Sequence, residues 1–210
     1  MILDFLMNID KSLILIIQSY GFFVYPFLFL IIFIETGLVI MPFLPGDSLL
    51  FASGALASKG LMNVFLVFLI ASSAAIIGDT VNYWIGNLVG EKISQSRFVK
   101  KEYLARTHGF YEKHGGKAII LARFIPIIRT FAPFVAGIGK MKYLKFLSFN
   151  IIGGILWTAL FIFGGFFFGN IPLIEQNFSI AIFVIIGISL LPIIIEFVRH
   201  KRKNIIFSAS

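Results

Sequence analysis

Cysteine is absent from this sequence, and histidine occurs only at His108, His114 and His200. Without cysteine the chain forms no disulfide bond, offers no thiolate nucleophile and lacks the usual ligands of a structural zinc site. His108 and His114 are six positions apart, a spacing that does not place both on one helix face. Neither a metal site nor another cofactor is expected.

Charged residues are also scarce, at 13% of the 210 residues, whereas hydrophobic residues make up 59%. The mean hydropathy is +0.97, so too little polar surface is available to cover a water-soluble globule of this size. Four stretches without charge are each about long enough to cross roughly 30 Å of hydrocarbon as a helix. They are residues 12–34, 60–78, 146–174 and 176–195. The sequence therefore predicts an all-α integral membrane protein and excludes a soluble enzyme.

The formal net charge is +8, and the basic residues concentrate in two segments. Residues 91–117 contain Lys92, Arg97, Lys100, Lys101, Arg106, Lys113 and Lys117, and the tail at 199–210 contains Arg199, Lys201, Arg202 and Lys203. By the positive-inside rule both segments face the cytoplasm, so the charge indicates membrane orientation rather than a nucleic-acid partner. Residues 91–117 are predicted to form an amphipathic cytoplasmic segment.

An even number of crossings must separate two segments that face the same compartment. Residues 146–169 and 178–198 supply two clear spans between the basic segments. The apolar residues 118–140 must then leave the cytoplasmic side and return to it. This stretch is interrupted by Pro126, Pro133 and Gly137. We therefore expect a re-entrant helical hairpin here, because proline breaks regular helix.

The N-terminal half follows the same order. Residues 26–58 contain a first span and a stretch broken by Pro42, Pro45 and Gly46, and residues 61–89 contain a further span. Working back from the cytoplasmic segment, the first hairpin enters from the opposite side. Two opposed re-entrant hairpins in one membrane domain, residues 1–210, are typical of an inverted-repeat transporter with a substrate site near the midplane. Whether residues 1–25 cross the membrane or lie at its interface stays open.

Four charged side chains fall within the broken or apolar segments: Glu35, Asp47, Arg123 and Arg129. An uncompensated charge near the bilayer centre costs about 3 kcal/mol on insertion scales, so partners or water are required. The planar fork of a guanidinium suits phosphate, and a partly desolvated carboxylate can gain or lose a proton. Arg123 and Arg129 are thus predicted to bind phosphate, with Glu35 and Asp47 as charge partners and proton carriers. Asp79 is a secondary candidate, which pairs with an arginine or caps the end of its span.

Other interpretations of these charges stay open. The acids and arginines could form structural salt bridges that tie the hairpins together. The protein could instead be a proton-coupled exporter of small ions or drugs that supports membrane homeostasis. An intramembrane enzyme is not expected, because its chemistry would need a histidine or a metal cluster near the arginines, and the histidines lie in the predicted loop and tail. A scaffold for membrane assembly would tolerate neutral replacements at all four positions.

The chain resembles the DedA family, also called SNARE-associated or VTT-domain proteins. The strongest block comprises Arg123, Phe124, Pro126, Arg129, Thr130, Pro133, Ala136, Gly137 and Met141, followed by Phe146, Asn150, Gly153 and Trp157. Upstream, Glu35, Pro42, Pro45, Gly46, Asp47, Gly54 and Ala57 resemble the family's first hairpin, and Gly78, Asp79, Tyr83, Gly86 and Gly90 resemble a helix-end motif. Asn87 departs from the pattern, because many members have arginine there, so any role of that arginine cannot be carried over.

The resemblance implies a flippase-like transporter of anionic lipid in the bacterial cytoplasmic membrane. Its implied substrate is a polyprenyl phosphate, in bacteria undecaprenyl phosphate returned to the inner leaflet for envelope synthesis. The implied partners are this lipid, the surrounding bilayer lipids and protons. The implied protein crosses the membrane several times with a cytoplasmic C-terminus. The direction of transport, the driving ion and the oligomeric state stay open, and a homo-oligomer is compatible with the sequence.

Overall fold

The computed structural model describes residues 21–38, 46–94, 115–169 and 171, and every regular element within them is helical. The elements are η1 (Gly21–Phe23), α3 (Val24–Gly37), α4 (Gly46–Ser58), α5 (Val64–Ser94), α7 (Lys117–Ala122), α8 (Pro126–Ile138) and α9 (Tyr143–Phe168). Several predictions lie outside the described residues: the fate of residues 1–20, the breaks at Pro42 and Pro45, most of the amphipathic segment, and the span and tail after residue 171.

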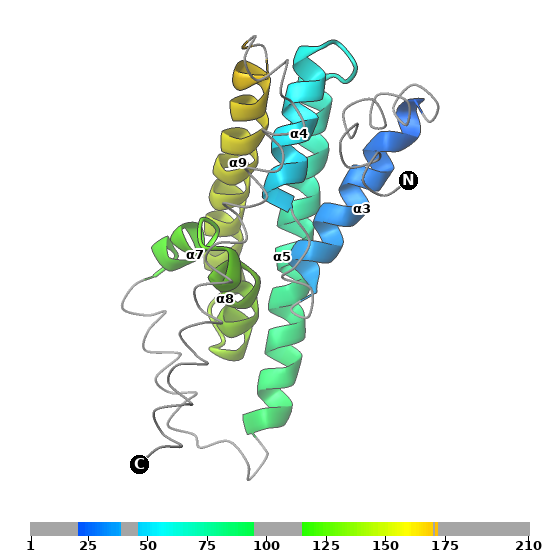
Figure 1. Cartoon of the computed structure of the whole chain (residues 1–210). Helices are drawn as coiled ribbons and strands as arrows, with labels where there is room; N and C mark the ends of the chain where they lie inside the picture. Colours follow the sequence, from blue (N-terminus) through cyan, green and yellow to red (C-terminus); the bar gives the residue numbers. More distant parts are fainter. Residues whose placement is uncertain (1–20, 39–45, 95–114, 170, 172–210) are drawn as a thin grey trace, which may run out of the picture.

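Two long helices form the centre of the molecule and run in opposite directions (Figure 1). Val64–Val89 in α5 and Tyr143–Phe168 in α9, 26 residues each, are long and apolar enough to cross a membrane. At 1.5 Å per residue each covers about 39 Å, more than the roughly 30 Å of a hydrocarbon core. These helices correspond to the spans predicted at 61–89 and 146–169.

Helix α3 contains 14 residues and covers the start of the span predicted from residue 26. A helix of that length covers about 21 Å and does not cross a bilayer core alone. Helix α3 descends toward the middle of α5 and ends there, where a Cβ added to Gly37 would lie 3.4 Å from the Cα atom of Gly78 (Figure 1). These two glycines thus let the α3 and α5 backbones approach closely.

Two short helices, α4 and α8, contain 13 residues each and lie beside opposite halves of the long pair. In Figure 1, α4 packs along the upper half of α9 and α8 packs along the lower half of α5. Helix α4 begins at the predicted break Gly46, and α8 begins at the predicted break Pro126, a favoured first position for proline.

The prediction that Pro133 and Gly137 break the second hairpin is wrong, because both lie inside α8. The chain instead turns at residues 123–125, between α7 and α8. Gly137 has a packing function, since a Cβ there would overlap the carbonyl oxygen of Tyr83 on α5.

Reciprocal glycine contacts bring the backbones of α4 and α9 together. A Cβ on Gly54 would overlap the carbonyl oxygen of Ile162, and a Cβ on Gly165 would overlap the carbonyl oxygen of Phe51. Helices in a lipid environment pack through such small residues, because the absence of a side chain allows close approach. The α4–α9 crossing therefore depends on glycine from both helices.

The α5–α8 crossing has the same pattern. A Cβ on Gly86 would overlap the carbonyl oxygen of Phe134, just as one on Gly137 would overlap that of Tyr83. In both crossings the glycine of each helix follows, by three positions, the residue whose carbonyl oxygen meets the partner glycine. The two crossings thus have the same packing pattern. In one the short helix α4 precedes the long helix α9 in the sequence, and in the other the long helix α5 precedes the short helix α8.

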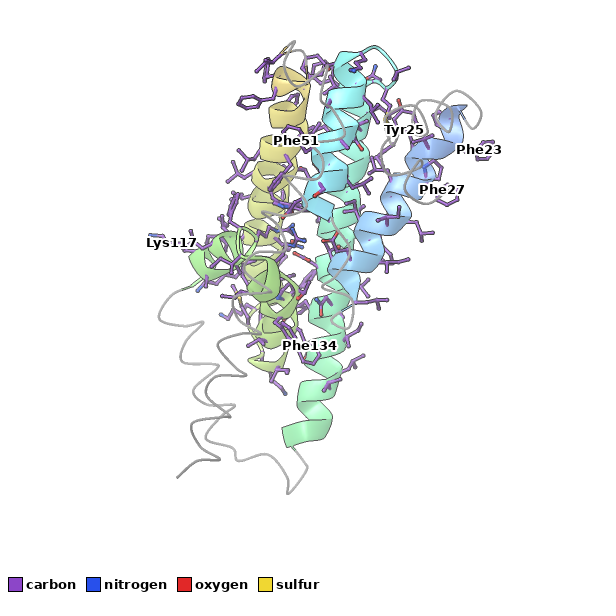
Figure 2. The ribbon with its side chains drawn as sticks, in the orientation of Figure 1. Phe23, Tyr25, Phe27, Phe51, Lys117 and Phe134 are labelled. Carbon is purple, nitrogen blue, oxygen red and sulfur yellow. The ribbon has the colours of Figure 1, made fainter. Side chains whose placement is uncertain are left out.

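The distribution of polarity is inverted relative to a water-soluble protein. Large apolar side chains cover the outside: Phe65, Phe167 and Leu144 are 72%, 70% and 77% exposed. Phe23 and Phe27 point away from the bundle in Figure 2. Acids and arginines lie inside, as described below. An apolar exterior around a charged interior is the arrangement expected of a protein surrounded by lipid.

Candidate functional site

Five ionisable side chains from five segments meet at the centre of the described structure. Glu35 lies near the end of α3, Asp47 at the start of α4, Asp79 in the middle of α5, Arg123 in the turn after α7, and Arg129 in the first turn of α8. None of the five is more than 9% exposed. Charged residues near the ends of the short helices therefore lie beside the middle of the long helices.

Arg129 binds two carboxylates at once. Its Nη1 donates to Oδ1 of Asp47 at 2.6 Å, and its Nη2 donates to Oε1 of Glu35. Trp157 completes this group, because its Nε1 donates to the same Asp47 oxygen at 2.9 Å and its ring centre lies 4.6 Å from the guanidinium carbon. An arginine over an indole face gains a cation–π attraction that strengthens when water is excluded. Arg129 thus connects α8 to both α3 and α4.

Arg123 forms a separate group with different partners. Its Nη2 donates to Oδ2 of Asp79 and to Oδ1 of Asn150. The amide of Asn150 in turn donates to the carbonyl oxygen of Ile76 at 3.0 Å. The amide therefore fixes Arg123 and the two long helices relative to one another.

Glycine makes room for these side chains. A Cβ on Gly46 would overlap the carboxylate of Glu35, and a Cβ on Gly153 would lie 2.9 Å from Cδ of Arg123. A Cβ on Gly154 would lie 3.5 Å from Nη2 of the same arginine. The resemblance block contains Gly46 and Gly153, and the structure gives both a steric reason.

Asn82 on α5 links α3 and α8 through main-chain atoms. Its Nδ2 donates to the carbonyl oxygen of Thr36 at 3.2 Å and to that of Thr130 at 2.7 Å. Thr36 belongs to α3 and Thr130 to α8. One buried amide therefore holds both short segments against the same long helix.

The cluster contains three acids and two arginines. The primary prediction contained two acids and two arginines, so Asp79 is the additional carboxylate. Asp79 does not cap a helix boundary, because α5 continues for 15 residues beyond it to Ser94. Buried ion pairs persist only with good geometry and additional hydrogen bonds, and removal of one partner typically costs about 3–5 kcal/mol. The Trp157 N–H group that donates to Asp47 and the Asn150 amide oxygen that accepts from Arg123 supply such additional bonds.

The structure brings together all four primary candidates but divides them unequally. Both Glu35 and Asp47 pair with Arg129, whereas Arg123 pairs with Asp79. Residue-by-residue reasoning missed Asn82, Asn150 and Trp157 as members of the site. A signal for two of them was present in the sequence, because Asn150, Gly153, Gly154 and Trp157 recur at the 3, 4 and 7 spacing that marks one face of a helix.

Comparison with known proteins agrees with this arrangement. The sequence pattern of the VTT domain matches residues 44–167, which include every charged member of the cluster except Glu35. Protein DedA of Escherichia coli strain K12 is 53% identical over 206 residues, covering 96% of this chain and 94% of the relative. No solved structure matches the chain.

More distant relatives are also membrane proteins by name. An uncharacterized membrane protein of Mycobacterium leprae is 44% identical over 83% of this chain and 81% of its own length. The inner membrane protein YqjA of Escherichia coli is 35% identical over 69% of this chain and 67% of its own length. With the VTT-domain match and the apolar exterior, these similarities place the chain in the DedA family of membrane proteins.

Proposed function

We propose that this protein moves an anionic lipid across the bacterial cytoplasmic membrane, with a polyprenyl phosphate, in bacteria undecaprenyl phosphate, as the substrate. One observation carries the proposal: two arginines are held at the centre of a lipid-facing helical bundle by carboxylates that a phosphate could replace. Exchange of one anion for another avoids the cost of leaving a buried charge without a partner. The process involves movement of the head group and no covalent chemistry.

The proposed architecture is an inverted repeat with two re-entrant hairpins. Helices α3 and α4 would form the hairpin from the outer face, and α7 and α8 the hairpin from the cytoplasmic face. Two observations support this assignment: α4 and α8 lie beside opposite halves of the long pair (Figure 1), and both crossings use the same reciprocal glycine contacts. In known transporters of this type the substrate lies near the midplane between the repeats. The proposed topology has several crossings and a cytoplasmic C-terminus.

The proposed transport cycle separates the hairpins in turn. The ion pairs of Arg129 join its hairpin to Glu35 and Asp47 of the other hairpin. Opening toward either face must therefore weaken these pairs. A proton taken up by one of the carboxylates would do so, since a neutral acid attracts the guanidinium less strongly. Glu35 and Asp47 are the proposed proton carriers.

The excess of acid over arginine favours a second candidate function. Three buried carboxylates face two guanidinium groups, and proton-coupled exporters of small ions or drugs rely on intramembrane acids of this kind. In that mechanism the arginines would only hold the acids in place. Substrate competition separates the two functions, because a lipid-phosphate transporter is inhibited by other lipid phosphates and an exporter is not.

The test is the movement of labelled undecaprenyl phosphate across proteoliposomes that contain the full chain. Wild type is compared with Arg123→Gln, Arg129→Gln and Glu35→Gln, with and without a proton gradient. Lys117→Gln is the matched control, because it removes a positive charge from an exposed position six residues before Arg123. The expected result is lipid movement by wild type and the control, loss in both arginine variants, and loss of gradient sensitivity in Glu35→Gln. Folded wild type that moves no lipid would contradict the proposal.

A further inference from the structure

The guanidinium of Arg123 is only partly used. Its Nη2 atom makes both of its polar contacts, to Asp79 and Asn150. Nε and Nη1 are buried and have no hydrogen-bond partner within the described part of the chain, and the same holds for Oδ1 of Asp79. The ion pair therefore uses one donor atom and one acceptor atom, although both groups can form paired bonds. Nε and Nη1 of Arg123 are therefore available to donate to a larger anion than the Asp79 carboxylate.

Arg129 differs in this respect. Both of its terminal nitrogens are bonded to carboxylates, and its guanidinium lies against the Trp157 ring. Only Nε lacks a partner among the described atoms. A phosphate that bound Arg129 would have to displace two acids, whereas one that bound Arg123 displaces one.

The local charge favours Arg123 as well. With its acids ionised, the group of Arg129, Glu35 and Asp47 carries one net negative charge, which repels a second anion. The pair of Arg123 and Asp79 is neutral, so replacing the Asp79 carboxylate with a phosphate oxygen keeps the arginine paired. Electrostatics thus directs an entering phosphate to Arg123.

The position of Arg123 suits a ligand that arrives from the lipid. The arginine is 2% exposed, but the next two residues of the turn, Phe124 and Ile125, are each 45% exposed on the outer surface. On the inner side the arginine side chain packs directly against the backbone at Gly153 and Gly154. In this turn two lipid-facing residues directly follow a buried guanidinium, so a head group could enter there while its apolar chain stays outside.

We propose that Asp79 is an internal substitute for the phosphate, which occupies Arg123 when no lipid is bound and is displaced when the head group enters. Arg123 is then the arginine that exchanges its anion, and Arg129 is a clamp that keeps its two acids during binding. This assignment rests on the proposed function and divides the roles within it. It also supplies a reason for release, because Asp79 competes for Arg123 and drives the phosphate out again. A transporter needs such competition, since a substrate bound too tightly does not leave.

The test is equilibrium binding of labelled undecaprenyl phosphate to the purified full chain in nanodiscs, with inorganic phosphate as the competitor. Asp79→Asn removes the internal anion and keeps a side chain of similar shape. It is expected to bind the lipid about tenfold more tightly than wild type, about the value of one hydrogen bond to a charged group. Glu91→Gln is the matched control, because it removes a negative charge from α5 at a position 12 residues beyond Asp79 and outside the charge cluster. Its affinity is expected to stay within about threefold of wild type. Competition by inorganic phosphate shows that the phosphate group alone is recognised, and its absence shows that the lipid is required.

A pair of lysine variants keeps the test decisive if Asp79→Asn does not fold. Arg123→Lys and Arg129→Lys both retain a positive charge but lose the planar fork. Arg123→Lys is expected to bind the lipid at least about tenfold more weakly than Arg129→Lys. Only Arg123→Lys removes the unpaired Nε and Nη1 donors that would bind the phosphate. Equal losses would overturn the division of roles.

The outcomes separate this inference from the function on which it rests. Unchanged or weaker binding by folded Asp79→Asn, together with lipid movement by wild type, overturns the internal-substitute proposal and leaves the transport function intact. Wild type that neither binds nor moves the lipid overturns both. The double variant Asp79→Asn/Arg123→Gln, in which neither charge remains, is expected to fold and to lose lipid binding, which excludes a general effect of altered stability.

Discussion

The guanidinium carbon of Arg129 lies 4.6 Å from the centre of the Trp157 ring, while both residues donate to the same oxygen of Asp47. The indole therefore acts on the ion pair in two ways, by its face and by its N–H group. Trp157 is fully buried on α9, opposite the first turn of α8. Trp157, which its residue type alone would assign to the apolar core, thus holds the side chains of Arg129 and Asp47 in position.

Replacement of Trp157 separates these two contributions. Trp157→Phe retains an aromatic face but removes the donor to Asp47, which we expect to lower stability by about 1.5–3 kcal/mol, the range for a hydrogen bond to a charged group. Trp157→Ala also leaves a cavity and should cost about 3–5 kcal/mol. Thermal unfolding in detergent measures both. A Phe variant as stable as wild type would show that the hydrogen bond contributes nothing.

Removal of Arg129 should be more harmful than removal of either acid. Arg129→Gln leaves both Glu35 and Asp47 buried without their cation, and loss of one partner of a buried pair costs about 3–5 kcal/mol. Glu35→Gln leaves Arg129 still paired with Asp47, so its effect should be smaller. Addition of Asp47→Asn to Arg129→Gln should recover part of the lost stability. Wild type, Arg129→Gln, Asp47→Asn and the double variant form a double-mutant cycle in thermal unfolding, and strict additivity would argue against coupling.

The glycine crossings provide a matched set of alanine substitutions. Gly54→Ala and Gly137→Ala each force a Cβ into a partner carbonyl group, and both should unfold at lower temperature and transport less lipid. Gly164→Ala is the control, because apart from the adjoining backbone of α9 no described atom lies within 4 Å of its added Cβ. It should be neutral or stabilising by up to about 1 kcal/mol, since alanine favours helix more than glycine. Similar losses at Gly54 and Gly137 are expected if the two crossings are equivalent, and a loss at only one would contradict that.

The absence of native cysteine permits a direct test of topology. Lys59→Cys lies in the turn between α4 and α5, and Lys140→Cys lies in the turn between α8 and α9, at the other end of the molecule (Figure 1). The proposed inverted repeat places position 59 outside and position 140 in the cytoplasm. A membrane-impermeant maleimide should label Lys59→Cys in intact cells and Lys140→Cys only in inverted vesicles. Labelling of both from one side would exclude opposed hairpins.

Much of the fold could be predicted because a helix that crosses lipid needs a long apolar stretch with few charged residues. Charge-free stretches of sufficient length predicted α5 and α9 in nearly the correct places. Two of the predicted breaks, Gly46 and Pro126, are the first residues of α4 and α8. Pro133 misled this reasoning, because a proline inside a packed helix can be tolerated when neighbouring helices compensate. The helix continues through Pro133 because its packing against α5 extends as far as Gly137.

The membership of the charge cluster was partly predictable, and its pairing was not. Charge in an apolar segment identifies Glu35, Asp47, Arg123 and Arg129, because such residues need partners. Which acid meets which arginine depends on how α4 and α8 are placed along the long helices, and no local pattern specifies that. For Asp79 the sequence allows either an arginine partner or the end of its span, and the continuation of α5 to Ser94 decides in favour of the partner.

The hydrogen bonds of the Asn82 amide determine which neighbouring positions tolerate substitution. It reaches Thr36 and Thr130 only through their carbonyl oxygens, which every amino acid possesses. Substitutions at positions 36 and 130 that keep the helices intact therefore leave these two bonds in place, whereas loss of the amide at position 82 removes both together. One side chain on α5 therefore joins α3 to α8, beside the ion pairs of Arg129, and a single substitution at position 82 removes both of its bonds.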